Sequence, residues 1–345
     1  MVYVKNVHNN ATKLTFKLVS TSLKLQLKKK EIMKILKILT AIVFAAQINT
    51  AISANEIKMG KADWDTGYFQ AEIYKKALEK MGYKVTGPTV MKPQVFYVAA
   101  ASGDMDLWVN GWFGNHDTYV SEAKGKVKPV GYVAKSGGLQ GYLIDKKTAD
   151  KFGIKSIMDI KKHSKEFDAN GDGKADMVAC HPGWGCEKII SKHFEELGLG
   201  DFINPIKADY GAAMADIISR YKNGKSILFY TWTPNWTVGT LKLGKDIVWI
   251  EAPYSATKIV SVPNATKAKL NMGFGVNDIR PAANVDFLKA NPKVEKFLKK
   301  ASIPLEDIAT QNLKMNKGEK SDKAIKKHAE EWIKANQSTF DSWIK

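Results

Sequence analysis

The sequence predicts an α/β protein with two lobes, in which mostly parallel sheets are flanked by helices and a ligand cleft lies between the lobes. The first reason is that short apolar runs alternate with helical patterns after Ala54, which is typical of parallel strands joined by helices. The second is that the chain completes one such section, builds another, and then leads back through the apolar strand DIVWIEAP. We therefore expect residues 55–142 and 245–345 to form lobe I, and residues 143–244 to form lobe II. A cleft between two lobes is a common place for a ligand site.

The first section shows the alternation most clearly. After the strand-like IKMG, a helix is predicted from Tyr68 to Lys80, because apolar residues recur there at intervals of three and four and Gly82 provides a stop. The pattern continues with a strand at Val85–Met91, a helix near Gln94–Ala101 and a strand at Asp106–Trp112. Trp64 and Trp112 stand near the carboxyl ends of predicted strands, where ligand sites in parallel sheets lie.

The second section begins at GYLIDKKTADKFG and contains a predicted helix at Ala212–Lys222, followed by the strand ILFYTWTPNW. The tail from Val285 onward has a helical pattern. We expect three tryptophans at apolar spacings to belong to the core: Trp249, Trp332 and Trp343.

Residues 33–54 are predicted to form a secretory signal peptide, because two lysines precede an apolar run from Ile38 to Ala46 and small residues follow up to Ala54. The run is shorter than the roughly 20 residues that a spanning helix needs. This length favours export to the periplasm over a retained N-terminal anchor, and no Cys follows the run to carry a lipid. Met33 is the expected natural start, so residues 1–32 are interpreted as an upstream extension.

The formal net charge of +18 is partly a property of the amino-terminal stretch. Residues 1–54 contain nine lysines and one glutamate, so 44 basic and 34 acidic residues remain, a net charge of +10. These basic residues are dispersed, with no dense Lys/Arg run interleaved with aromatic residues to follow a phosphate backbone. The sequence therefore predicts no nucleic-acid partner.

Cys180 and Cys186 lie six residues apart in ACHPGWGCEK. In an oxidising compartment two such cysteines usually form a disulfide, and we expect a structural bridge here. The alternative is a redox-active pair, which would need a CxxC spacing and a clear thiolate-stabilising helix start.

Tryptophan is concentrated beside turn residues in three segments, WVNGWFGNHD, CHPGWGCE and YTWTPNW. Trp184 stands between Gly183 and Gly185 inside the cysteine loop, with little neighbouring apolar sequence to pack against. Aromatic faces gathered in a cleft attract an alkylated cation with about 0.5 to 2 kcal/mol each. These segments therefore indicate a cage for a quaternary ammonium group.

Such a cage alone is too weak for micromolar binding, which requires about 8 kcal/mol. The N–H groups of Gly185 and Cys186 precede CEKIISKHF, which reads as the start of a helix, and amides in that position bind anions. His116 is a candidate side-chain donor to the same anion. A cation cage beside a carboxylate site predicts a zwitterionic ligand.

The chain resembles the periplasmic glycine betaine/proline betaine binding proteins of ProU-type ABC importers, a ProX-like family with an OpuAC-type domain. The resemblance covers about Ile57 to Trp343 and rests on SGDMDLWVNGWFGNHD, QGYLIDKKTAD, FDANGDGKADM, CHPGWGCE, AAMADIISRYKNGK, FYTWTPNW and GKDIVWIEAP. It implies a type II periplasmic binding protein with the disulfide and a hinged closure. It also implies roles for residues in two groups. The cage would be Trp112, Trp184 and Trp232, and the carboxylate site would be Gly185, Cys186 and His116.

Two segments depart from the family pattern. Where the family commonly has Trp-Thr-Pro before Leu-His-Asp, this chain has WFGNHD, so the pocket wall around Phe113 and Asn115 is expected to differ. The segment ADWDTGYF resembles the first-strand Trp-Asp of a related betaine-binding subfamily. Trp64 is therefore a candidate fourth wall of the cage.

The loop DANGDGKAD has part of a calcium-loop spacing. Candidate ligands at the first, third, fifth and ninth positions are Asp168, Asn170, Asp172 and Asp176. The twelfth position is Ala179 in place of the bidentate Glu, and Asp, Asn and Gly also form turns capped by their own side chains. A capped turn without metal is expected, with a structural calcium as the alternative, and no cofactor is predicted.

These observations favour a monomeric transport receptor that binds a betaine and docks on an ABC permease in the inner membrane. The alternative is a secreted hydrolase or lyase acting on choline-type compounds, but no GxSxG elbow, zinc-ligand spacing or pair of glycosidase carboxylates is present. A sensor module that signals through another protein is a third possibility. We expect that the protein is not an enzyme.

Overall fold

The computed structural model describes residues 56–253, 261–263 and 269–345. The predicted signal peptide and the upstream extension lie outside the described residues. Glu56–Lys345 forms one compact unit. Among the residues described, no helix combines the length and the apolar character needed to cross a membrane.

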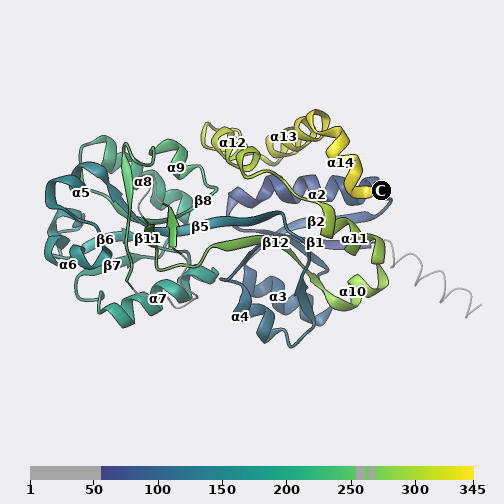
Figure 1. Cartoon of the computed structure of the whole chain (residues 1–345), viewed down its shortest axis with the longest axis horizontal. Helices are drawn as coiled ribbons and strands as arrows, with labels where there is room; N and C mark the ends of the chain where they lie inside the picture. The colour runs from purple at the N-terminus through teal and green to yellow at the C-terminus, as the bar shows by residue number, and fades with distance from the viewer. Residues whose placement is uncertain (1–55, 254–260, 264–268) are drawn as a thin grey trace, which may run out of the picture. The chain divides into compact units, whose positions relative to one another are not determined.

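A ten-stranded sheet runs through this unit in the order β2-β1-β3-β12-β5-β8-β6-β7, with β4 beside β12 and β9 beside β5 (Figure 1). Its strands are β1 (Glu56–Ala62), β2 (Lys84–Met91), β3 (Leu107–Phe113), β4 (Val127–Pro129), β5 (Ala134–Asp145), β6 (Ala175–Val178), β7 (Ile203–Ile206), β8 (Leu228–Thr233), β9 (Ile247–Ile250) and β12 (Asn277–Asn284). A separate pair consists of β10 (Ser261–Pro263) and β11 (Lys269–Asn271).

The sheet has two halves with parallel pairing. In the first half β1 lies parallel to β2 and β3, and in the second half β6 lies parallel to β7 and β8. Between the halves β12 pairs antiparallel with β3 and β5, and β5 pairs antiparallel with β8. The α/β class is confirmed, and the antiparallel pairs arise because β5 and β12 carry the chain between the halves in opposite directions.

The twelve-residue β5 contributes to both halves. Its beginning pairs with β12 and its end pairs with β8 and β9. The apolar segment DIVWIEAP forms β9 and stays beside the second half, and the strand that pairs with β3 of the first half is β12. The lobe boundaries given above stay a prediction.

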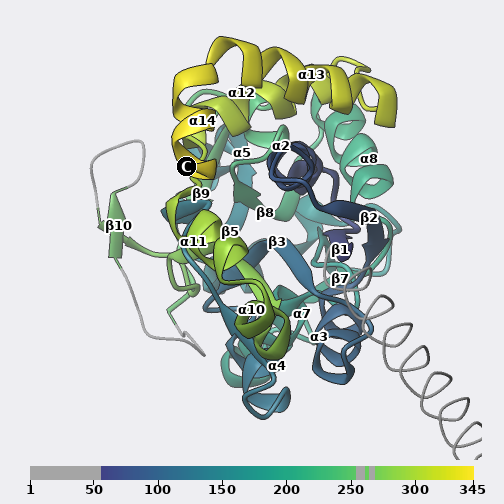
Figure 2. The ribbon, with the colours of Figure 1, turned by 90° about the vertical axis from the view of Figure 1, so that its right-hand side faces the viewer.

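Helices cover both faces of the sheet (Figures 1 and 2). They are α2 (Tyr68–Lys80), α3 (Pro93–Ser102), α4 (Asp117–Glu122), α5 (Lys146–Phe152), α6 (Ile160–His163), α7 (Gly185–Leu197), α8 (Tyr210–Lys222), α9 (Thr237–Thr240), α10 (Val285–Ala290), α11 (Pro292–Lys300), α12 (Leu305–Asn316), α13 (Asp322–Ala335) and α14 (Gln337–Ile344). Three short 3-10 helices are Asp65–Gly67, Ile157–Asp159 and Ser164–Phe167. The helix predicted at Tyr68–Lys80 is confirmed, as is the helical tail.

The carboxyl-terminal helices extend the core of the first half, where α12 and α13 lie over α2 (Figures 1 and 2). The Trp332 and Trp343 rings stack there with centroids 5.7 Å apart, and both are buried. Trp249 is buried as well, in β9. All three expected core tryptophans are therefore confirmed as core.

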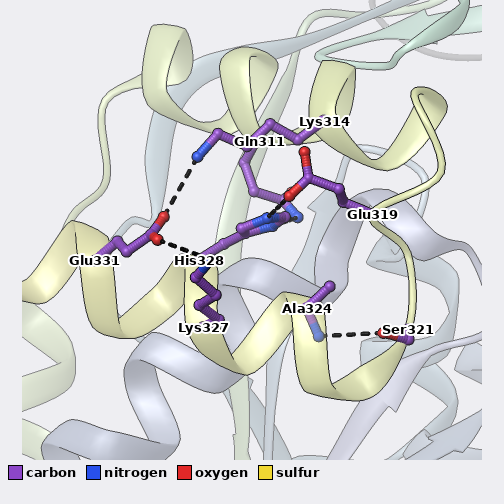
Figure 3. A network of polar contacts seen from close by, with 8 residues as sticks. All are labelled: Gln311, Lys314, Glu319, Ser321, Ala324, Lys327, His328 and Glu331. Carbon is purple, nitrogen blue, oxygen red and sulfur yellow. Dashed lines mark hydrogen bonds and ion pairs between the residues drawn. The ribbon is translucent and has the colours of Figure 1, made fainter.

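A polar network joins α12 to α13 (Figure 3). His328 Nε2 lies 3.0 Å from the Glu319 carboxylate, and Lys314 forms an ion pair with Glu331 at 3.5 Å. Ser321 caps α13 by accepting a hydrogen bond from the Ala324 N–H at 3.2 Å. The exposed Lys314–Glu331 ion pair contributes at most about 1 kcal/mol, so the buried aromatic residues contribute more to the packing of these helices.

Candidate functional site

A pocket lies where the first and second halves of the sheet meet. Its lining consists of Trp64, Trp112, Asn115, His116, Gln140, Trp184, Gly185, Cys186, Tyr230 and Trp232. The cavity itself is small, with a volume of about 30 Å³ open to the centre of a water-sized sphere. The structure brings together in this lining all seven residues that the sequence analysis places in a ligand site.

The tryptophans come from separate elements. Trp112 lies near the end of β3, Trp184 precedes α7, and Trp232 lies in β8. Trp184 packs edge to face against Trp64 and Trp232, with centroids 5.2 Å and 5.6 Å apart. Tyr210 supports Trp232 from behind, at 4.6 Å between ring centroids. Perpendicular indoles give a pocket walled by both ring faces and ring edges.

Asn110 holds two of these rings. Its side-chain oxygen accepts hydrogen bonds from Nε1 of Trp64 at 2.8 Å and from Nε1 of Trp112 at 3.0 Å. Sequence reasoning missed this residue, although an asparagine inside the apolar strand LWVNGWF is itself a signal of a buried polar role. Gly138 in β5 leaves room for the other side of Trp112, since a Cβ there would lie 2.5 Å from the ring.

His116 is buried at the start of α4. Burial lowers the pKa of its imidazole to about 3, because the charged form would lose its hydration. Its Nδ1 lies 3.2 Å from the hydroxyl of Tyr97. If that hydroxyl donates, the neutral ring carries its proton on Nε2, and this tautomer can donate a hydrogen bond to an anion.

The N-terminus of α7 supplies backbone donors. Within the described residues, the N–H groups of Gly185 and Cys186 have no protein acceptor, as expected for the first positions of a helix. A side chain on Gly185 would place Cβ 2.8 Å from the carbonyl oxygen of Asn115. Glycine at this position therefore allows the second half to approach the first half closely.

Cys180 and Cys186 form a disulfide, as predicted. The bridge connects the segment after β6 to the first turn of α7 and encloses Trp184. One covalent loop therefore carries both an aromatic wall of the pocket and the free amides.

Gln140 links the elements around the pocket. Its oxygen accepts hydrogen bonds from Asn115 Nδ2 at 2.8 Å and from the Tyr230 hydroxyl at 2.6 Å, and its nitrogen donates to Asn277 at 2.7 Å. Sequence reasoning also missed Gln140 and Tyr230, which belong to apolar strands. Among the described residues, the side-chain oxygen Oδ1 of Asn115 is buried without a protein partner. Asn115 therefore places a polar group in the pocket wall that is expected to differ from the family pattern.

The acidic loop after the 3-10 helix Ser164–Phe167 is capped by its own side chains. Asp168 accepts hydrogen bonds from the N–H groups of Gly171 and Gly173, and these bonds lower the pKa of its exposed carboxyl. Asp172 accepts one from the N–H of Lys174, and Asp176 accepts one from the N–H of Ala169. Across the described residues, no group of three or more His, Cys, Asp or Glu side chains is arranged to hold a metal ion. A structural calcium, the alternative given in the sequence analysis, stays untested.

The fold and the pocket together define the class of protein. Two sheet halves joined by β5 and β12, with helices on both faces and an aromatic pocket where they meet, are the architecture of a type II periplasmic binding protein. The chain belongs to the OpuAC family, the substrate-binding domain of ABC-type glycine betaine transport systems, which it matches over residues 55–335.

Curated relatives and solved structures agree with this assignment. The chain is 42% identical over 283 residues to the glycine betaine-binding periplasmic protein OusX of Dickeya dadantii, covering 80% of this chain and 85% of that one. It is 40% identical over 284 residues to the glycine betaine/proline betaine-binding periplasmic protein of Escherichia coli, with the same coverage. Lactococcal OpuAC, crystallised in its closed-liganded conformation with glycine betaine, shares the fold with a TM-score of 0.65 at 20% identity, covering 84% of this chain and 100% of that one.

Proposed function

We propose that this protein is the substrate-binding component of an ABC importer and that its ligand is a quaternary-ammonium osmolyte of the glycine betaine/proline betaine type. The observation that carries this proposal is the meeting of four tryptophans with the free amides of α7 in one pocket. The names of the relatives support the same ligand class.

The tryptophans would surround the methylated nitrogen. A permanently charged ammonium cannot donate a hydrogen bond, so it is recognised by the negative faces of aromatic rings. Trp64, Trp112, Trp184 and Trp232 are each buried to more than 90%, which reduces competition from water for the cation.

The carboxylate would lie against the N-terminus of α7. Two backbone N–H groups at a helix start favour an anion through their hydrogen bonds and through the helix dipole. Neutral His116 adds a third donor through Nε2. A donor that carries no charge orients the carboxylate without adding a second cation beside the ammonium group.

We further propose that the protein is a monomer, reaches the periplasm by way of its signal peptide, and delivers its ligand to a permease in the inner membrane. Binding would take place without turnover. Among the described residues, the pocket lining provides rings, amides and a neutral imidazole, and it contains no nucleophile paired with a base, which a hydrolase or lyase would need.

Calorimetry on purified residues 55–345 tests the proposal. Glycine betaine is expected to bind and to be recovered chemically unchanged. Trp184→Leu keeps an apolar side chain but removes the aromatic face, so it should weaken binding at least tenfold, consistent with about 1.4 kcal/mol per tenfold change. Trp343→Leu is the matched control, because it removes a buried indole in α14 outside the pocket. Equal affinities for the two variants would contradict the aromatic cage.

The carboxylate site is tested with ligands that lack the anion. Trimethylamine and choline are expected to bind far more weakly than glycine betaine, because the amides of Gly185 and Cys186 and the His116 donor would have no anion to bind. Competition calorimetry gives the three affinities. Equal affinity for choline and glycine betaine would show that these donors are misassigned.

A further inference from the structure

A short segment of the first half receives indole N–H groups from the second half. It consists of Asp63, Trp64, Asp65 and Thr66, which follow β1, and we call it the Asp63–Thr66 segment. Nε1 of Trp184 donates to Asp63 at 2.7 Å, and Nε1 of Trp232 donates to Thr66 Oγ1 at 3.4 Å.

The same segment makes a third contact of this kind. The side chain of Trp236, which follows β8, forms a hydrogen bond with the carboxylate of Asp65. Three tryptophans of the second half therefore share one acceptor segment of the first half. Trp64 itself faces the pocket, and its own N–H is bound to Asn110 within the first half.

The hydrogen bond from Trp184 to Asp63 differs from two other hydrogen bonds between the cysteine loop and the first half. Lys92 Nζ donates to the carbonyl oxygen of Pro182 at 3.0 Å, and the hydroxyl of Tyr119 donates to that of Gly183 at 3.4 Å. Both reach the backbone of the loop. Asp63 bonds the indole, so it acts on the orientation of a ring that lines the pocket.

The surroundings of the two carboxylates matter for a cationic ligand. Asp63 and Asp65 are half-buried, and burial raises the pKa of each, while their indole hydrogen bonds act in the opposite direction. A carboxylate bonded to an indole N–H places negative charge at the edge of the ring. Because the interior screens charges less than water does, this charge favours a cation in the pocket, against the opposing field of Lys92 and His181 near Asp63 and of Lys320 near Asp65.

We propose that Asp63 and Asp65 are positioning residues that hold the tryptophans of the second half across the closed cleft and bias the pocket toward ligands with a cationic head group. This inference rests on the proposed function. The bonds join opposite halves, so they would form as the cleft closes and break as it opens. The geometry assigns the larger role to Asp63, whose partner Trp184 lines the pocket, and the smaller role to Asp65, whose partner does not.

The test compares two ligands of the same shape. Glycine betaine carries a trimethylammonium group, and 3,3-dimethylbutanoate carries a neutral tert-butyl group on the same carboxylate chain. Their affinities are measured by competition, and the release rate of glycine betaine is measured by stopped-flow tryptophan fluorescence. The variants are Asp63→Ala, Asp63→Asn and Asp65→Asn.

The chain offers a matched control. Asp307 accepts a hydrogen bond from Nε1 of Trp332 at 2.8 Å, but both residues lie in the carboxyl-terminal helices. Asp307→Ala therefore removes the same type of bond from an indole that does not line the pocket. It is expected to lower the melting temperature and to leave both affinities unchanged.

For Asp63→Ala we expect at least tenfold weaker binding of glycine betaine, mainly through faster release. In Asp63→Asn an acceptor remains for the indole, so release should be slower than in the alanine variant. The preference for glycine betaine over the neutral analogue should nevertheless fall at least threefold, because the charge is gone. Asp65→Asn should change release less than Asp63→Ala does.

Release rates and ligand preference in the Asp63 variants equal to those of Asp307→Ala would overturn the inference. If Asp63→Ala does not fold, Asp63→Asn decides the question through the ligand preference alone. A wild-type protein that fails to bind glycine betaine would instead refute the proposed function, so the two failures are distinguishable.

Discussion

Small polar residues position the large rings of the pocket. Asn110 bonds two indoles at once, and Gln140 joins Asn115 to Tyr230. These amides are buried, where an unpaired polar group costs about 1 to 3 kcal/mol. Trp64, Trp112 and Tyr230 therefore have a preferred orientation before a ligand arrives, which reduces the ordering cost of binding.

Two buried histidines make stability depend on pH. Burial lowers the pKa of His116 to about 3 and that of His193 to about 4, while an unfolded histidine titrates near 6.5. Between these values the unfolded chain binds more protons than the folded one. The free energy of unfolding should therefore fall as the pH drops below about 6.5, by up to about 1.4 kcal/mol per pH unit for each histidine.

Urea denaturation at several pH values between 7.5 and 4.5 checks this expectation. Half-buried carboxylates such as Asp63 have raised pKa values and act in the opposite direction near the acidic end of this range. The quantity to compare is therefore how the free energy of unfolding depends on pH in the wild type and in His193→Gln, and this dependence should be weaker in the variant. Parallel curves for the two proteins would contradict the lowered pKa of His193.

At the scale of elements, the cysteine loop and α7 are joined covalently and form one structural unit. The disulfide joins the residues before the helix to its first turn. Trp184 and the amides of Gly185 and Cys186 lie within this unit, and Asp63 of the first half accepts a hydrogen bond from Trp184. The proposed wall for the ammonium group and the proposed donors for the carboxylate therefore have a common support.

Removing the disulfide should weaken both stability and binding. A loop of this size predicts a loss of roughly 2 to 3 kcal/mol in the free energy of unfolding. The Cys180→Ser/Cys186→Ser variant leaves every backbone N–H in place, so any loss of betaine affinity reports on the rigidity of the loop. Differential scanning calorimetry and titration calorimetry measure the two effects, and an unchanged melting temperature would show that the bridge is dispensable.

At the scale of the whole molecule, β5 and β12 connect the two halves through antiparallel pairs, and the pocket lies beside this connection. Hydrogen bonds from Trp184 to Asp63 and from Trp232 to Thr66 also join the two halves. We propose that rotation about the connecting strands would open the pocket and that ligand contacts made from both halves would favour the closed form.

Glycine betaine is therefore expected to stabilise the protein and to make it more compact. At a ligand concentration of 100 times the Kd, the free energy of unfolding should rise by about 2.7 kcal/mol. Thermal unfolding measures this gain, and small-angle X-ray scattering should show a smaller radius of gyration with ligand than without. A stabilised protein with unchanged scattering would mean that binding takes place without closure.

Local signals in the sequence were enough for several of the elements and for most of the residues that line the pocket. The spacing of apolar residues predicted α2 and the helical tail, because one face of each helix must be apolar to pack. Trp184 was a candidate because of its glycine neighbours, and the disulfide was predictable from two cysteines in a chain with a predicted signal peptide.

Tertiary structure alone decided which strands pair and which polar groups meet the tryptophans. The antiparallel pairing of β5 and β12 depends on the path of the chain between distant segments. Local periodicity in the sequence gives no information about that path. Asp63 and Trp184 are 121 residues apart, and Asn115 and Gln140 are 25 apart. Hydrogen bonds over such separations leave no periodic trace in the sequence, because they depend on where the folded backbone places each side chain.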